Sequence, residues 1–384
     1  MKKTLLLQTA LVAAAGLMLA DAANAQTKAV PIGVTVGGYM TRAFMFQDRG
    51  NAQVDQPSKT FGQPDAEIWF NIRSVLDNGT VIGGRVELEG STEADQIDES
   101  YLFVEKHDLG RIEVGSTDLV PNKMLYGAPN AIPGESTTVT GSAAAFFGGN
   151  TYMGWFAANP NDSEHINVYT SSNRYFGSKV GKGLQLGFSY APNVCQDNVN
   201  VDSVNACQSF TSKANNSTPN NMQDVYALAA NYVESFGPVD GALYVGWYSG
   251  RPGSASNATG DRAGGIQGGV NFAWNVGGGS QIQLGGLYTQ EESDAVTANR
   301  HIWTAGLKYL TNGAAPGSVG LGLEGRKAHV TGSGDEDLYM LGVTYQVATG
   351  ILTFAGVGHE KIDSDTAGSD NKQNFGKIGM RLDF

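Results

Sequence analysis

Hydrophobic and polar residues alternate with a period of two along most of the chain. In residues 264–288, GGIQGGVNFAWNVGGGSQIQLGGLY, the apolar Ile266 and Val270 share one parity, and the polar Gln267 and Asn271 share the other. The chain ends in GKIGMRLDF, which keeps the same alternation up to its final aromatic residue. Such alternation predicts β-strands with one apolar face and one polar face.

The alternation divides the chain into sixteen predicted strands, each about long enough to cross a bilayer at a tilt. Their predicted bounds are 31–47, 65–76, 80–90, 98–106, 110–116, 166–175, 183–191, 223–236, 239–249, 262–276, 280–290, 300–311, 317–330, 336–348, 350–361 and 373–384. Connections after even-numbered strands are short, whereas those after odd-numbered strands are mostly longer and polar. A soluble β-sandwich also alternates, but it gives no reason to sort its loops by side.

The pattern therefore predicts an all-β fold: a transmembrane up-and-down antiparallel β-barrel of 16 strands, with a long loop after strand 5. Backbone amides cannot stay unpaired in hydrocarbon, so a spanning sheet must close on itself. We expect the last strand, 373–384, to close the barrel against the first strand, 31–47.

The longest connection, residues 117–165, contains bulky apolar side chains that are unusual in a surface loop. They are Met124, Leu125, Tyr126, Phe146, Phe147, Trp155 and Phe156. A structureless loop of this length is uncommon and usually functional. We predict that it folds into the lumen and packs against the inner wall. The alternative is an extracellular loop that covers its own hydrophobic cluster.

Residues 1–25 have the features of an export signal. Met1-Lys2-Lys3 is basic, residues 5–19 are apolar, and Ala23-Asn24-Ala25 forms a small-x-small cleavage site. We therefore expect a mature chain, residues 26–384, that forms one barrel domain. A transmembrane anchor is the alternative, but the apolar run is short for one.

Charge and cysteine content narrow the class of protein further. The net charge is −12, so the chain has no excess of Lys or Arg with which to displace phosphate counterions, and we expect no nucleic-acid partner. The two cysteines, Cys195 and Cys207, are spaced to form a disulfide in an oxidising compartment. An unstrained bridge of this span would contribute about 3 kcal/mol.

The layout resembles the 16-stranded general porins of Gram-negative outer membranes. The resemblance covers the mature chain and rests on the signal peptide, VTVGGYMT in the first strand, DNGTVIGGRVELE at the second hairpin, LGRIEVGS at the fifth strand and the terminal Phe384. It implies a homotrimer in contact with outer-membrane lipid and lipopolysaccharide. It also implies recognition of the last strand, through Phe384, by the outer-membrane assembly machinery. Two features depart from the family: the acidic PEF-type motif of the constriction loop is absent, and Ser116 stands where many relatives carry Arg.

Strand parity predicts which charged side chains line the lumen. The acidic set is Glu67, Glu87, Glu89, Glu105, Glu113, Glu324 and Asp383, and the basic set is Arg73, Arg85, Arg111, Lys308, Arg326, Lys377 and Arg381. These cancel, so the loop 117–165 decides the sign, and there Asp118, Glu135, Asp162 and Glu164 face only Lys123. We predict a modest cation preference, with Glu135 at the constriction and Arg73 and Arg85 on the opposing wall. The alternative is that Glu135 only caps the turn after Pro133-Gly134.

Enzyme and metal motifs are weak in this sequence. GLGLEG at 320–325 matches G-x-G-x-x-G, but it lies in a predicted strand and opens no helix. We therefore expect no enzyme and no cofactor. The acidic segments 332–337 and 363–371 could hold calcium, although they lack EF-hand spacing. The sequence predicts a channel for passive diffusion of small hydrophilic solutes. The alternatives are a sugar-specific channel that uses the loop aromatics, and a structural or adhesin barrel without an open pore.

Overall fold

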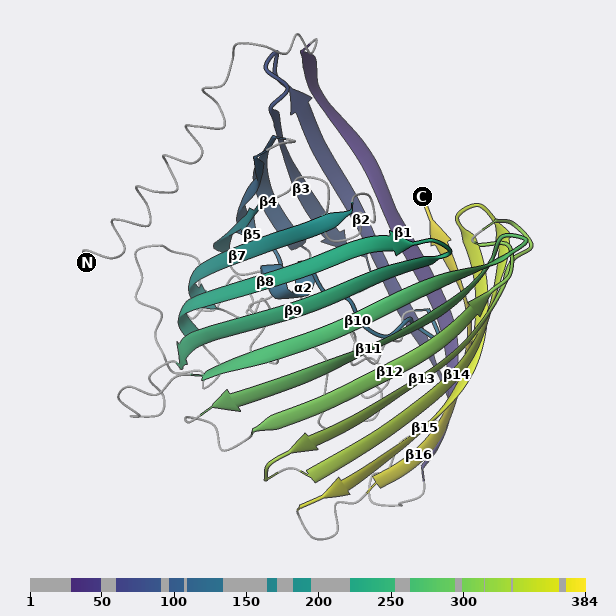
Figure 1. The fold of residues 1–384 in the computed structure, drawn as a ribbon. Coiled ribbons are helices and arrows are strands. Elements are labelled where there is room, and N and C mark those ends of the chain that lie inside the picture. Colours follow the sequence, from purple (N-terminus) through teal and green to yellow (C-terminus); the bar gives the residue numbers. More distant parts are fainter. Residues whose placement is uncertain are drawn as a thin grey trace.

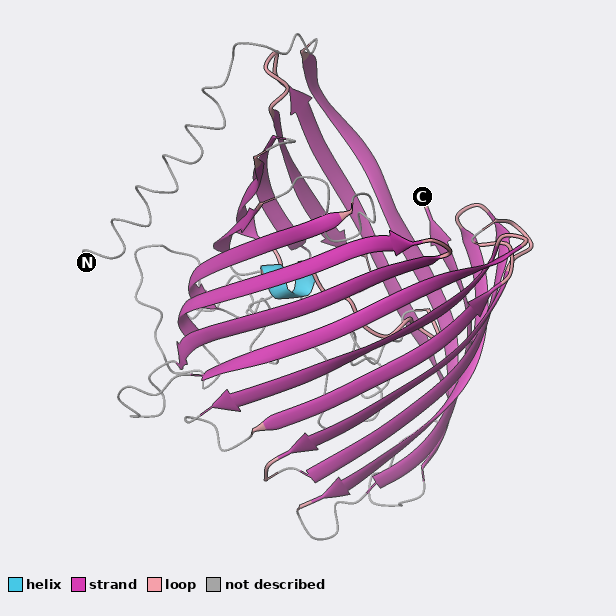
Figure 2. Ribbon diagram, viewed as in Figure 1, coloured by secondary structure: helices cyan, strands magenta, loops and turns pink. Residues whose placement is uncertain are grey.

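The computed structural model describes residues 29–49, 60–90, 97–106, 109–133, 164–170, 182–194, 222–252, 263–293, 299–313, 315–332, 334–365 and 371–384. These residues form one closed antiparallel barrel, in which each strand pairs with its sequence neighbours and β1 pairs with β16 (Figure 1). The predicted 16-stranded barrel is confirmed. Figure 2 shows that strands dominate the described part and that its short helix lies inside the barrel.

The strand bounds agree with the predicted segments to within a few residues at most ends. The strands are β1 (Val30–Arg49), β2 (Thr60–Val75), β3 (Val81–Glu89), β4 (Ile97–Lys106), β5 (Gly110–Ser116), β6 (Glu164–Tyr169), β7 (Gly183–Val194), β8 (Met222–Phe236), β9 (Val239–Pro252), β10 (Ala263–Gly277), β11 (Ser280–Ser293), β12 (Arg300–Leu310), β13 (Val319–Val330), β14 (Gly334–Ala348), β15 (Ile351–Ser364) and β16 (Asn371–Asp383). β2 begins earlier than predicted because its first residues pair with the far end of β1 as far as Thr60. Residues 171–175 of the predicted sixth segment lie outside the described part.

Tight hairpins connect several strand pairs at one end of the barrel. In the β2–β3 turn Gly79 has φ 78°, and in the β14–β15 turn Gly350 has φ 74°. A residue with a Cβ is strained at such angles, so glycine allows these turns to be short. The Gly350 carbonyl also accepts a hydrogen bond of 2.8 Å from the backbone N–H of Asp383.

The two ends of the chain complete the barrel wall. β1 and β16 are in register from Tyr39 opposite Asp383 to Arg49 opposite Gln373. Beyond this ladder, the N–H of Gly38 donates to the Phe384 carbonyl over 2.9 Å, and the N–H of Phe384 donates to the Gly38 carbonyl over 3.0 Å. The pairing thus continues through the last residue, and the expectation that the last strand closes the barrel is confirmed.

The two faces of the wall have opposite chemistry. On β13 and β14 burial alternates residue by residue, with Leu321 and Leu341 exposed on the outside at 52% and 48%, and Glu324 and Arg326 buried inside. Exposed apolar side chains outside and buried polar side chains inside invert the arrangement of a soluble protein. They are the arrangement of a barrel that spans a membrane. Among the described residues, no helix is long and apolar enough to cross a membrane.

Candidate functional site

Residues 117–133, which we call the inner strap, follow β5 and run across the inside of the barrel. The Tyr244 hydroxyl donates to the Pro121 carbonyl over 2.7 Å, and Asn271 donates to the Gly127 carbonyl over 2.9 Å. Further along, the N–H of Ala131 donates to Glu324 over 3.0 Å. These partners lie on β9, β10 and β13, so the strap crosses most of one wall. The described part of the loop therefore folds into the lumen, as predicted.

The strap begins with one helical turn, α2 (Val120–Lys123), which sequence analysis did not predict. Pro121 in its first turn suits a helix start, because proline lacks the N–H that would be unpaired there. Val120 and Met124 pack with Tyr169, Ala229, Tyr244 and Leu287 of the wall, and Leu125 and Tyr126 lie against the same cluster. The predicted wall packing is thus confirmed for Met124, Leu125 and Tyr126.

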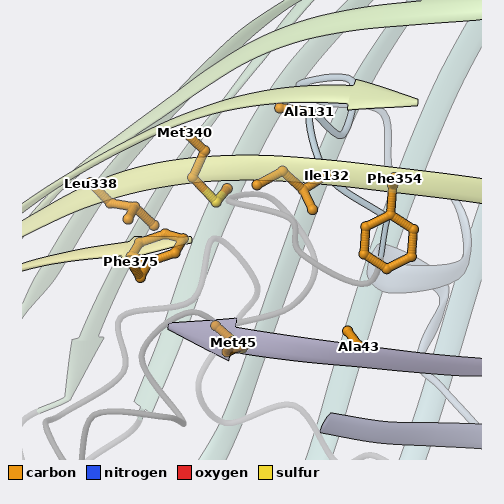
Figure 3. Close-up of a cluster of buried hydrophobic side chains, with 8 residues drawn as sticks. All are labelled: Ala43, Met45, Ala131, Ile132, Leu338, Met340, Phe354 and Phe375. Carbon is orange, nitrogen blue, oxygen red and sulfur yellow. The ribbon is translucent and has the colours of Figure 1, made fainter. Parts of the chain in front are cut away.

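The far end of the strap packs against strands on both sides of the β1–β16 pairing that closes the barrel. Ala131 and Ile132 form a buried cluster with side chains from β1, β14, β15 and β16, namely Ala43, Met45, Leu338, Met340, Phe354 and Phe375 (Figure 3). Ile132 is fully buried in it. This cluster anchors the strap opposite the point where it leaves β5.

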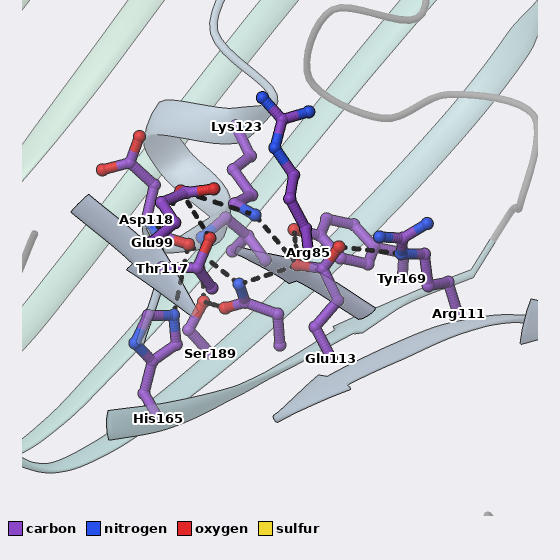
Figure 4. Close-up of polar contacts among 12 residues, drawn as sticks. Arg85, Glu99, Arg111, Glu113, Thr117, Asp118, Lys123, His165, Tyr169 and Ser189 are labelled. Atoms are coloured by element: carbon purple, nitrogen blue, oxygen red, sulfur yellow. Dashed lines mark hydrogen bonds and ion pairs between the residues drawn. The ribbon is translucent and has the colours of Figure 1, made fainter. Parts of the chain in front are cut away.

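A buried ionic network holds the start of the strap (Figure 4). Lys123 lies 3.2 Å from Glu113, and Arg111 binds the other oxygen of Glu113 at 2.7 Å. Tyr169 and Asn167 also donate to Glu113, over 3.1 and 3.2 Å. Burial disfavours a charged Lys123, but attraction by Glu113 outweighs it and raises the pKa of the amine. Lys123 and Glu113 therefore both stay charged where they meet on the inner side of the wall.

Asp118 lies in the same network but in a more acidic environment. Its backbone carbonyl accepts a hydrogen bond of 2.8 Å from Asn167, while its carboxyl lies near Glu99, which accepts a 2.6 Å hydrogen bond from Thr117. Burial and repulsion by Glu99 raise the pKa of Asp118 to about 7, despite attraction by Lys123. Asp118 and Lys123, both predicted pore residues, are thus brought together at the wall rather than across the channel.

In the described part of the chain, the strap reaches β1 and β16 only around Met45, Phe375 and Lys377, and the remaining wall of β16 and β1–β3 carries aromatic and cationic side chains on its lumen face. Arg381 lies 3.9 Å over the ring of Tyr39, and Arg85 lies 4.6 Å over the ring of Trp69. Arg381 also binds Asp383 at 2.8 Å, and Arg85 pairs with Glu87. Stacking on a ring restrains a guanidinium group, so these two predicted lining residues hold fixed positions along the wall.

Carboxylates gather on the lumen face of β2–β4. Glu67, Glu89 and Asp98 each place an oxygen within 4.8 Å of the others. Glu67 also accepts hydrogen bonds from Tyr39 and Trp69, both of 2.8 Å. Asp65, Glu87 and Glu99 lie on the same three strands, and the Tyr39 hydroxyl also bonds Asp65. The geometry could attract a cation, although acidic groups are common without a bound metal.

The remaining predicted lining residues are distributed between the strap and the wall. Glu324 accepts the Ala131 N–H, Lys308 donates to the Asn130 carbonyl over 3.1 Å, and Lys377 donates to the Pro133 carbonyl over 3.5 Å. Arg326 is paired with Glu336, Glu105 lies 3.3 Å from Arg111, and Arg73 is exposed on β2. Glu135, Cys195 and Cys207 lie outside the described residues, as do residues 1–25 and most of the predicted extracellular loops.

Several buried charges near the strand ends at the longer connections were not predicted from the sequence. Arg300 binds Glu291 at 2.5 Å, and the carboxylates Glu336 and Glu360 are also buried. The parity that places Met340 inside could have found Glu336. In the acidic segments that could hold calcium, Asp335 pairs with His329, Asp337 with Lys327, and Asp363 with Lys361. These pairings do not favour calcium binding, and the expectation of no cofactor stays a prediction.

Comparison with known proteins identifies the family. The model of the Gram-negative porin family matches residues 9–365, and the chain belongs to this family. It is a protein of the outer membrane of a Gram-negative bacterium. A comparison with curated proteins found no match.

Solved structures share the fold at low sequence identity. The anion-selective porin from Comamonas acidovorans is 13% identical, with a TM-score of 0.55 over 92% of this chain and 100% of that one. The trimer form of OmpT from Vibrio cholerae is 12% identical, with a TM-score of 0.55 over 92% and 100%. The outer membrane channel DcaP of Acinetobacter baumannii is 13% identical, with a TM-score of 0.56 over 94% and 100%. At these identities the likeness establishes the fold.

Proposed function

We propose that this porin conducts small hydrophilic solutes and ions passively, with a modest preference for cations and no catalytic step. The strap covers the lumen face of β7–β15 and ends against parts of β16 and β1, and the solute path runs beside the rest of the wall formed by β16 and β1–β4. Water and ions there meet charged and aromatic side chains at fixed positions, and the lining charges set selectivity.

The observation that carries the cation preference is the group of six carboxylates on β2–β4. It consists of Asp65, Glu67, Glu87, Glu89, Asp98 and Glu99. Close like charges in a confined lumen raise the local concentration of counterions, and are screened less than charges on an open surface. The sequence prediction placed the deciding charge at Glu135. Its role stays a separate prediction, tested by Glu135→Gln.

Reversal potentials across planar bilayers under a KCl gradient test this proposal. We expect the wild type to prefer potassium, and the triple variant Glu67→Gln/Glu89→Gln/Asp98→Asn to move the permeability ratio toward unity. A matched control removes three carboxylates that each face a base: Asp335→Asn/Asp337→Asn/Asp363→Asn. Anion preference in the wild type, or equal ratios in both variants, would refute the proposal. Absence of current steps would favour a closed structural barrel, and sugar-dependent block would favour a sugar-specific channel.

We further propose that the protein is a homotrimer and that the strand ending in Phe384 is recognised during outer-membrane assembly. The trimer form recorded for the similar OmpT barrel supports the first point. The outer face of β2–β6 supports it too, because its large exposed hydrophobic side chains are aliphatic, as at Ile82, Leu102 and Val114. Phe384 is 64% exposed although its backbone is paired, which leaves its ring accessible to lipid, lipopolysaccharide or an assembly factor.

A further inference from the structure

The strap crosses a line of very small residues on the inner wall. Each strand from β7 to β15 contributes one lumen-facing residue to this line, which we call the glycine row. Its members are Gly187, Ala229, Gly246, Gly269, Gly285, Gly306, Gly322, Gly342 and Gly356. Nine consecutive strands thus place a glycine or alanine beneath the same crossing segment.

The row is continuous across the sheet. Gly187, Ala229 and Gly246 are direct register partners, as are Gly285 with Gly306, and Gly322 with Gly342 and then Gly356. The other steps are diagonal by two residues, which keeps the side chains on the same face. The row therefore forms an unbroken track from one side of the lumen to the other.

Close approach of the strap backbone explains why these positions lack larger side chains. A Cβ at Gly269 would lie 1.9 Å from the Tyr126 carbonyl oxygen, and one at Gly285 would lie 2.2 Å from that of Gly127. A Cβ at Gly342 would lie 2.2 Å from the Ala131 oxygen. None of these three glycines has the positive φ that would demand glycine for its own backbone. The strap, and not the strand geometry, excludes a side chain there.

Polar groups two residues from row members hold the strap backbone against the track. Asn231 donates to the Met124 carbonyl over 3.1 Å, and its strand carries Ala229. Asn271, Lys308 and Glu324 stand two residues after Gly269, Gly306 and Gly322, and they bond Gly127, Asn130 and Ala131. Tyr244 stands two residues before Gly246 and bonds Pro121. The wall thus binds the strap through its backbone groups, in addition to the side-chain packing of Met124 and Ile132.

We propose that the glycine row is the seat that positions the strap and thereby sets the bore of the channel, an inference that rests on the proposed diffusion function. Its members are positioning residues: they act on permeating solutes through the strap. A methyl group at Gly269 would have to move the Tyr126 carbonyl from 1.9 Å to ordinary contact near 3.4 Å. Since the wall lies behind, the strap can move only toward the channel axis.

The test compares two adjacent glycines on β10. Gly269→Ala fills the seat, whereas Gly268→Ala adds the same methyl to the exposed outer face, where nothing lies within 4 Å. We expect Gly269→Ala to lower single-channel conductance roughly 1.5-fold, because conductance follows the open cross-section, and Gly268→Ala to leave it unchanged. Both variants should keep the heat-resistant barrel on gels.

A second measurement, the reactivity of a thiol on the strap, reports the position of the strap directly. In a chain with Cys195→Ser and Cys207→Ser, Ile132→Cys places a thiol at a fully buried strap position. We expect this thiol to react slowly with a soluble thiol reagent, and faster when Gly342→Ala lifts the strap through its contact with the Ala131 backbone. This readout does not require conduction, so it separates failure of the seat from failure of the proposed channel function.

A graded variant keeps the proposal testable if Gly269→Ala does not fold. At Gly306 the nearest strap atoms would be 3.0 Å from a new Cβ, so Gly306→Ala requires only a small shift. We expect it to fold, with a smaller loss of conductance. If folded Gly269→Ala or Gly306→Ala matched Gly268→Ala in both conductance and thiol reactivity, the seat proposal would be wrong.

Discussion

The barrel has two walls that differ on both faces. On β1–β6, the described Tyr and Trp side chains point into the lumen: Tyr39, Trp69, Tyr101 and Tyr169. On β7–β15 most of them point outward: Tyr190, Tyr226, Tyr232, Trp247, Trp274, Tyr288, Trp303, Tyr309, Tyr339 and Tyr345. Aromatic belts mark membrane–water interfaces, so β7–β15 is the wall built for lipid.

The inner faces differ in the opposite sense. The β7–β15 wall carries only small, uncharged residues along the glycine row, where the strap covers it. The β1–β5 wall instead presents paired arginines, carboxylates and aromatic rings. One wall therefore separates lipid from the strap, and the other carries the charged lumen face and has no outward Tyr or Trp among its described residues. Under the function, trimer and strap seat proposed above, selectivity and subunit contact belong to one sector of the barrel, and lipid contact and the bore belong to the other.

The largest effect is expected where the strap leaves the β1–β6 wall, at its first residues after β5. Lys123→Met leaves Glu113 buried with Arg111 as its remaining cation, which should cost about 3 kcal/mol. We expect α2 to loosen and the open-channel current to fluctuate more. Lys123→Met/Glu113→Gln should recover part of the loss, because the buried Glu113 charge is removed together with its cation, while Arg111 keeps Glu105. An unchanged current in Lys123→Met would show that packing alone holds the strap.

A matched pair of arginine substitutions tests the outer faces. Val114 on β5 is 48% exposed and Leu307 on β12 is 47% exposed, so the two sites differ mainly in their wall. Leu307→Arg should destabilise the barrel by about 2 kcal/mol, measured by denaturant unfolding, since it places a charge in hydrocarbon. Val114→Arg should instead convert trimers to folded monomers on native gels. The assignment of the walls fails if both variants lose trimers equally, or if both lose only barrel stability.

Strand alternation predicted most of this architecture, because period-two patterning follows directly from a wall with two unlike faces. The length and apolar content of the loop 117–165 predicted the infolded Met124, Leu125 and Tyr126, because bulky apolar side chains are unfavourable in water. Strand parity tells which face of the sheet a side chain lies on, but neither how deeply it is buried nor which residue it contacts. It therefore did not predict the ion pair between Arg326 and Glu336. The glycine row left no signal of its own, because glycine fits either face and its role depends on a strap that is distant in sequence.

A smaller effect concerns pH and the start of the strap. The pKa of Asp118 is about 7, against an ordinary 3.8, because of burial and nearby Glu99 and Asp98, with Lys123 opposing. Raising the pH from 6 to 8 ionises it and adds a negative charge beside the acidic wall. Cation preference should therefore rise modestly over that range, and rise less in Asp118→Asn. Identical pH profiles would show that Asp118 does not titrate there.

The same shift has a consequence for stability. Between about pH 4 and pH 7 the unfolded Asp118 is ionised, whereas the folded one keeps its proton, so its contribution to stability falls as pH rises through that window. Asp118→Asn should flatten this part of the stability profile, measured by denaturant unfolding at several pH values. A profile unchanged by the substitution would contradict the raised pKa.

The smallest effect is expected from the predicted disulfide between Cys195 and Cys207, which lies outside the described residues. The connection that contains it follows β7 and precedes β8, whose own ladder runs from Gly183 opposite Val233 to Val194 opposite Met222. Because this ladder is complete without the bridge, reduction should free the connection but leave the barrel intact. Gel mobility before and after heating, with and without reductant, measures this. Loss of the heat-resistant form on reduction alone would mean that the bridge, and not the ladder, holds this part of the lipid-facing wall.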